Sequence, residues 1–122
     1  MKKLITLFTF IFAITLSAQA QEVKTVSLEQ TKGEFTQKEV KLSEGSYVFN
    51  IANNNAGTDV GFVLVLEGKD ASDAKNHIKE AYVTKVVAEG KSEKSNTVTL
   101  KKGTYKYFCP LNKTPQYTLT VE

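Results

Sequence analysis

The stretch GTYKYFCPLNKTPQYTLTV, residues 103–121, predicts two β-strands joined by a tight loop. Aromatic and aliphatic residues alternate with polar ones on both sides of the loop, which is the pattern of half-buried strands. Pro110 and Pro115 bracket the loop, and strand pairing must stop there because proline has no N–H to donate. Cys109, the single cysteine of the chain, stands where the first strand ends.

Similar patterns predict further strands towards the N-terminus. Alternating or continuous apolar runs favour strands over residues 21–32, 39–42, 47–51, 60–66, 83–88 and 97–100. Asp70 is a typical helix N-cap, and the apolar spacing that follows it predicts an amphipathic helix over residues 71–82. We therefore expect about seven or eight strands and one short helix.

Two blocks of this sequence resemble the cupredoxins, the small blue copper proteins. Residues 103–109, GTYKYFC, are similar to the strand that leads into the copper-site loop of that family. Residues 35–53 are similar to its N-terminal pattern, with Gln37 in place of the usual proline. The resemblance implies an all-β, antiparallel Greek-key β-sandwich with cupredoxin-like topology.

The copper ligands of the family are mostly absent from the matching positions. Cys109 is kept, but Asn112 stands three residues later, where the resemblance implies a histidine. The other histidine position falls on Asp59, or on Thr58 in the alternative register, and the only methionine is Met1. Cys109, Asp59 and Asn112 are thus the candidate metal ligands of a degenerate type 1 copper site.

The sequence leaves the role of Cys109 open. It is a buried inert thiol, a reactive thiol, an interchain disulfide partner or a metal ligand. A type 1 centre needs two imidazoles beside the thiolate, and His77 is the only histidine of the chain. We read His77 as a structural residue on the predicted helix. We expect no cofactor, with copper at a remodelled site around Cys109, serving copper binding or electron transfer, as the alternative.

The remaining function class is a non-catalytic binding module. Pro110, Leu111, Pro115 and Tyr117 form an expected apolar rim around the loop. The resemblance implies that a protein partner docks at this end, while the alternative is that these side chains only fill space. We do not expect an enzyme, because no base is available to pair with the one thiol.

Composition bounds the localisation and the partners. Residues 1–20 combine two lysines, an apolar run and the Ala18-Gln19-Ala20 cleavage pattern, so they predict a signal peptide before a domain at 21–122. The protein is then exported, to the periplasm or beyond, with no membrane span in the mature chain. The net charge of +3 falls to +1 without Lys2 and Lys3, and the absence of arginine disfavours nucleic acid as a partner.

Overall fold

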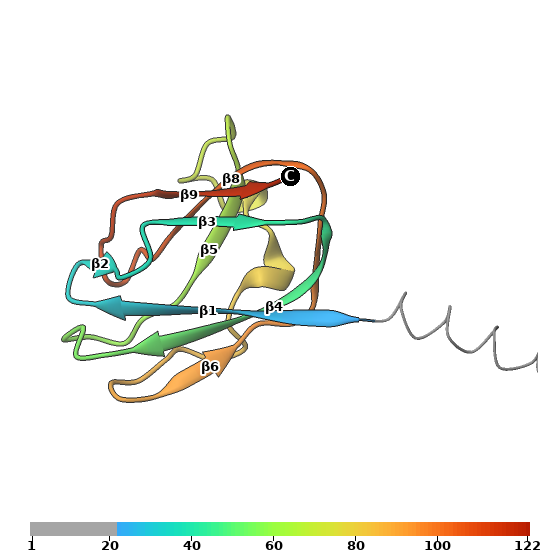
Figure 1. Ribbon diagram of the computed structural model, residues 1–122. Helices are drawn as coiled ribbons and strands as arrows, with labels where there is room; N and C mark the ends of the chain where they lie inside the picture. Colours follow the sequence, from blue (N-terminus) through green and yellow to red (C-terminus); the bar gives the residue numbers. More distant parts are fainter. Residues whose placement is uncertain (1–21) are drawn as a thin grey trace, which may run out of the picture.

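The computed structural model describes residues 22–122, and the predicted signal peptide lies outside them. Within this part of the chain, nine strands form two sheets packed as a β-sandwich (Figure 1). The strands are β1 (Val23–Thr31), β2 (Glu34–Phe35), β3 (Glu39–Leu42), β4 (Gly45–Asn53), β5 (Val63–Leu66), β6 (Ser92–Lys94), β7 (Val98–Leu100), β8 (Gly103–Phe108) and β9 (Tyr117–Val121). The predicted β-sandwich is confirmed, with one or two more short strands than expected.

The sheets are mixed, which corrects the expectation of a purely antiparallel sandwich. One sheet has the order β2-β1-β4-β6, with β7 also paired to β4, and the other has the order β3-β9-β8-β5. The β1–β4 and β3–β9 pairs are parallel, while the remaining pairs are antiparallel. The chain leaves the first sheet to form β3 in the second and then returns, so β4 runs in the direction of β1.

Alternating residues of both sheets fill the core. In β8 and β9 the register places Tyr107 opposite Tyr117, and both side chains are buried. Phe35 of the first sheet packs edge-on against Tyr107, with ring centroids 5.1 Å apart. Such aromatic pairs add to the stabilisation from burial alone. The quoted stretch therefore supplies one wall of the core, as its alternation predicts.

The predicted helix over residues 71–82 is wrong. Two single 3-10 turns, η1 (Ala74–Asn76) and η2 (Lys79–Ala81), stand in its place. Between them the backbone is extended, because the Ile78 N–H donates to the Leu64 carbonyl of β5 at 2.8 Å. The segment thus covers the edge of the second sheet, and a tertiary hydrogen bond overrides the helical spacing.

The predicted strand over residues 83–88 is also absent. Only single bridges form there, Val83 with Ser95 and Val87 with Val60. No helix of residues 22–122 is long and apolar enough to cross a membrane.

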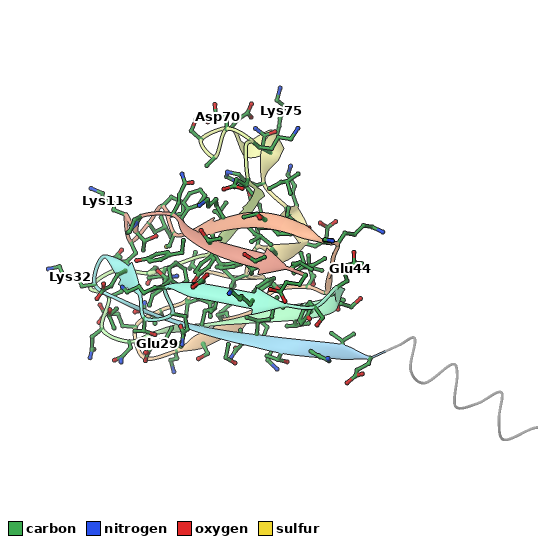
Figure 2. The ribbon with its side chains drawn as sticks, turned by 45° about the horizontal axis from the view of Figure 1, so that its top comes forward. Glu29, Lys32, Glu44, Asp70, Lys75 and Lys113 are labelled. Carbon is green, nitrogen blue, oxygen red and sulfur yellow. The ribbon has the colours of Figure 1, made fainter. Side chains whose placement is uncertain are left out.

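Several connections meet at one end of the sandwich (Figure 1). They include the β1–β2 turn, the β4–β5 loop and the loop between β8 and β9. Figure 2 shows Lys32 of the β1–β2 turn and Lys113 of the β8–β9 loop at this end, with Glu44 at the opposite end. The residues singled out from the sequence around Cys109 therefore lie at this end of the sandwich.

Candidate functional site

The loop between β8 and β9 closes tightly on itself. Thr114 holds both backbone groups of Cys109: its Oγ1 accepts from the Cys109 N–H at 2.9 Å, and its N–H donates to the Cys109 carbonyl at 3.1 Å. The Lys113 N–H donates to the Pro110 carbonyl at 3.2 Å, with Lys113 in the left-handed region at φ 52°. We call residues 109–114 the Cys109 loop.

The Cys109 thiol is buried and lies among backbone donors. Its Sγ accepts hydrogen bonds from the N–H of Gly61 at 3.3 Å and from the N–H of Asn112 at 3.4 Å. The side chain is fully shielded from solvent. Among residues 22–122, the only hydrogen-bond partners of this sulfur are thus backbone N–H groups, and no base touches it.

The structure brings Asn112 close to Cys109, but it commits the Asn112 amide elsewhere. The Oδ1 atom accepts from the Gly33 N–H at 2.8 Å, and Nδ2 donates to the Thr31 carbonyl at 2.7 Å and to Gln30 Oε1 at 3.1 Å. All three partners belong to the β1–β2 region, so this side chain ties the Cys109 loop to that turn.

Neither Asp59 nor His77 makes a hydrogen bond to the Cys109 sulfur. Asp59 is exposed on the β4–β5 loop. Both ring nitrogens of His77 have partners, the Tyr82 hydroxyl at 2.7 Å and the Ala71 carbonyl at 2.8 Å. In residues 22–122 no three His, Cys, Asp or Glu side chains are grouped so that they could hold a metal ion.

The other face of the Cys109 loop borders an apolar groove of about 250 Å³. Pro110 and Leu111 form one wall, and the opposite wall comes from the segment that follows η2. The lining residues are Gly61, Phe62, Val63, Tyr82, Val83, Val86, Pro110 and Leu111. We call this feature the Leu111 groove.

Two members of the predicted apolar rim lie in this groove, and two do not. Pro110 and Leu111 line it, whereas Pro115 is exposed outside it. Tyr117 is a correction to the predicted rim, because the residue is only 8% exposed and belongs to the core. Its hydroxyl accepts the Phe35 N–H at 3.2 Å, since a buried phenol needs a polar partner.

Sequence reasoning missed Gln30, Gly61 and the far wall of the groove. Gln30 is fully buried, and its Nε2 donates to the Gly61 carbonyl at 2.7 Å. A signal for it exists: Val26 and Leu28 alternate along β1, and Gln30 is the next residue in that buried phase. A polar side chain in an apolar phase indicates a buried hydrogen bond. No comparable signal marks the groove wall.

Burial also perturbs one tyrosine beneath the site. Burial raises the pKa of Tyr107 to about 12, with further contributions from the negative charges of ionised Tyr117 and Glu39. Its hydroxyl donates to the Gln37 carbonyl. The neutral phenol is therefore the form that the folded state favours.

Comparison with known proteins gives a family and several structural neighbours. The family described as cupredoxin-like domain matches residues 4–121. None of the curated proteins matches the chain.

Three solved structures illustrate the likeness. Auracyanin A, a "blue" copper protein from the green thermophilic photosynthetic bacterium Chloroflexus aurantiacus, is 20% identical with a TM-score of 0.69, over 83% of this chain and 100% of that one. The dithionite-reduced auracyanin of Roseiflexus castenholzii is 20% identical with a TM-score of 0.64, over 80% and 96%. An azurin from Methylomonas sp. strain J is 14% identical with a TM-score of 0.58, over 80% and 97%. At these identities the likeness shows the fold.

Proposed function

The chain belongs to the cupredoxin-like domain family, and from that premise we propose that it is an exported, non-catalytic binding module. Its binding face is the Leu111 groove, and a protein partner inserts an apolar side chain there. The Cys109 end of the fold carries no type 1 copper centre in this proposal.

The observation that carries the proposal is the exposure of large apolar side chains at the groove. Leu111 is 50% exposed and Val86 is 53% exposed, and both line the groove. Solvent-exposed apolar surface around a recess is typical of interaction sites. Loops held on a rigid sandwich are also the usual place for recognition.

The Gly61 floor supports the same proposal. Gly61 has no left-handed backbone conformation that would demand glycine, and a Cβ built there meets no atom within 4 Å. Neither the backbone conformation nor the packing therefore requires glycine at position 61. The lack of a side chain there does leave the groove open.

The donor chemistry does not fit a type 1 copper centre. Such a centre uses two imidazoles and a thiolate, and the whole chain has one histidine. Both ring nitrogens of that histidine are hydrogen-bonded, one to the Ala71 carbonyl and one to the Tyr82 hydroxyl. Asn112 offers only a neutral amide, already bonded on both sides.

The same geometry supports a non-catalytic role. A thiol nucleophile needs an adjacent base, and in residues 22–122 the Cys109 sulfur accepts only backbone N–H groups. His77 bonds within its own loop.

Site-specific photo-crosslinking tests the groove. A benzophenone side chain replaces Leu111 or Val86 in the exported protein of its source organism, and Leu66 serves as the control position because it is 42% exposed outside the groove. We expect a discrete adduct from positions 111 and 86 and none from 66. Adding Gly61→Leu, which fills the groove, must abolish it. Equal adducts at position 66, or adducts that survive Gly61→Leu, contradict the proposal.

Copper addition tests the alternative function, copper binding or electron transfer at a remodelled site. Purified protein and Cys109→Ser are compared by visible absorption and metal analysis. We expect no thiolate-to-copper band and no retained copper. An intense band that is absent from Cys109→Ser makes the remodelled copper site the leading function.

A further inference from the structure

Four residues close a hydrogen-bonded circuit at the end of the sandwich. The Cys109 sulfur accepts from the N–H groups of Gly61 and Asn112, at 3.3 and 3.4 Å. Gln30 joins the other two ends: its Nε2 donates to the Gly61 carbonyl at 2.7 Å, and its Oε1 accepts from Asn112 Nδ2 at 3.1 Å. We call this circuit the Cys109 ring.

The ring links three segments that lie far apart in the sequence. Gln30 comes from the end of β1, Gly61 from the β4–β5 loop, and Asn112 from the Cys109 loop. Asn112 extends the circuit by accepting from Gly33 in the β1–β2 turn at 2.8 Å. The ring therefore connects these segments to one another, as a metal ion bound by all of them would.

The three ring residues that contribute side chains are buried, Gly61 is partly exposed, and the polar side-chain atoms all have hydrogen-bond partners. Gln30 and Cys109 are fully shielded, and Asn112 is 6% exposed. No buried side-chain nitrogen or oxygen of residues 22–122 lacks a hydrogen-bond partner. A buried polar network in this state rigidifies and specifies a single packing, whereas a half-satisfied one is costly.

A metal ion that took Asn112 as a ligand in place of an imidazole would compete with the ring. Asn112 Oδ1 already accepts the Gly33 N–H, and turning the amide towards a metal ion would also break its bonds to Thr31 and Gln30. Each buried donor or acceptor left unpaired carries a desolvation penalty. In a type 1 centre an amide oxygen serves only as the weak axial ligand, so Asn112 is a poor replacement for an imidazole.

We propose that the Cys109 ring replaces a metal ion as the element that holds this end of the fold together, so that stability is independent of copper. Asn112 and Gln30 contribute the amide side chains that close the ring. The inference rests on the polar side of the Cys109 loop, and it stands whether or not a partner occupies the Leu111 groove.

A double-mutant cycle tests the ring in urea unfolding of the purified protein. Asn112→Leu keeps the approximate shape but removes every side-chain bond, and we expect it to lower the folding constant by about tenfold or more. Gln30→Met should lower it several-fold. Because both variants lose the shared Gln30–Asn112 bond, the double variant should lose less than the product of the two effects.

Asn96→Leu is the matched control, since Asn96 is exposed and its side chain is outside the ring. We expect it to leave the folding constant nearly unchanged. If Asn112→Leu does not fold, Gln30→Met and the copper measurement below decide. Ring variants that match the control, or single effects that simply multiply, overturn the proposal.

Copper alone is the second probe. Cu(II), and Cu(I) under reducing conditions, are added to wild type and to Cys109→Ser before unfolding. We expect the same midpoint with and without metal in both proteins. A midpoint that rises with copper in wild type but not in Cys109→Ser would show that a metal ion, not the ring, holds this end.

Discussion

The Cys109 loop has two faces of opposite character. On one face Asn112 is buried and makes three side-chain hydrogen bonds, all to the β1–β2 region. On the other face Pro110 and Leu111 border an open apolar groove, and Leu111 is half exposed. Leu111 and Asn112 are consecutive residues, yet they lie in these two different environments.

The difference teaches how a retained scaffold divides structural and interaction roles. A polar network whose buried side-chain atoms all have hydrogen-bond partners contributes rigidity and specificity of packing. An exposed apolar surface remains available to bind a partner, because its contact with water is unfavourable. We therefore expect substitutions on the Asn112 face to change stability and those on the Leu111 face to change binding.

Placing a charge on the buried face should have the largest effect. In Asn112→Asp the second carboxylate oxygen faces the Thr31 carbonyl and Gln30 Oε1, which are both acceptors. Burial and these acceptors should raise the carboxyl pKa above its unfolded value of about 3.9. The stability of the variant is then fully present below about pH 4 and lost as pH rises.

Near pH 7 we expect Asn112→Asp to lose about 3 kcal/mol or more, as for an uncompensated buried charge. Urea unfolding between pH 3 and 8 measures this. Asn112→Leu carries no charge and should be destabilised equally across the range. An Asp variant that is as stable at pH 7 as at pH 4 would mean that the site is open to water.

Alkaline pH should lower the free energy of unfolding through the buried Tyr107. Burial raises the pKa of Tyr107 to about 12, from the usual value of about 10 for a tyrosine. The neutral phenol therefore stabilises the fold fully below about pH 10, and this contribution is lost as pH rises through about 12. Unfolding free energies between pH 8 and 12 should fall for wild type. The fall should be shallower for Tyr107→Phe, and equal slopes would contradict this assignment.

The sulfur itself should matter through its hydrogen bonds. Cys109→Val has a similar shape but cannot accept, so it leaves the N–H groups of Gly61 and Asn112 unpaired, at a cost of about 2 kcal/mol. Cys109→Ser can still accept both and should lose less. Chemical unfolding of the two variants checks the order, and a Val variant more stable than Ser would show that burial alone matters.

The apolar face should show the smallest effect on stability. Leu111→Ser and Val86→Ser change exposed side chains, so the free energy of unfolding should stay within about 0.5 kcal/mol of wild type. The same variants should lose the crosslinked partner. Thermal and urea unfolding measure the first part, and a loss above about 1.5 kcal/mol would make the groove wall structural.

Much of the fold was predictable because its signals are local. Alternation in residues 103–121 predicts β8 and β9, and the structure has Gly103–Phe108 and Tyr117–Val121 there. The segment 71–82 was not predictable, since its helical spacing yields to a hydrogen bond between Ile78 and Leu64. Parallel pairing of β1 with β4 depends on an excursion to the other sheet, which no local pattern encodes.

The site was predictable only in part. Loop spacing places Cys109 and Asn112 together, and the structure joins them through the Asn112 N–H. The partners Gln30 and Gly61 lie 82 and 51 positions before Asn112, so only the folded chain brings them together. The assignment of Asp59 as a ligand stays a prediction, with its side chain exposed on the β4–β5 loop.

The most direct measurement of the central claim is hydrogen exchange of the Asn112 side-chain amide by NMR, with and without copper. The account predicts slow exchange, unchanged by copper, because Nδ2 donates to both Thr31 and Gln30 in a buried position. The exposed Asn96 amide provides the fast reference in the same spectrum. Exchange as fast as that of Asn96, or an Asn112 resonance that moves when copper binds, would contradict the account.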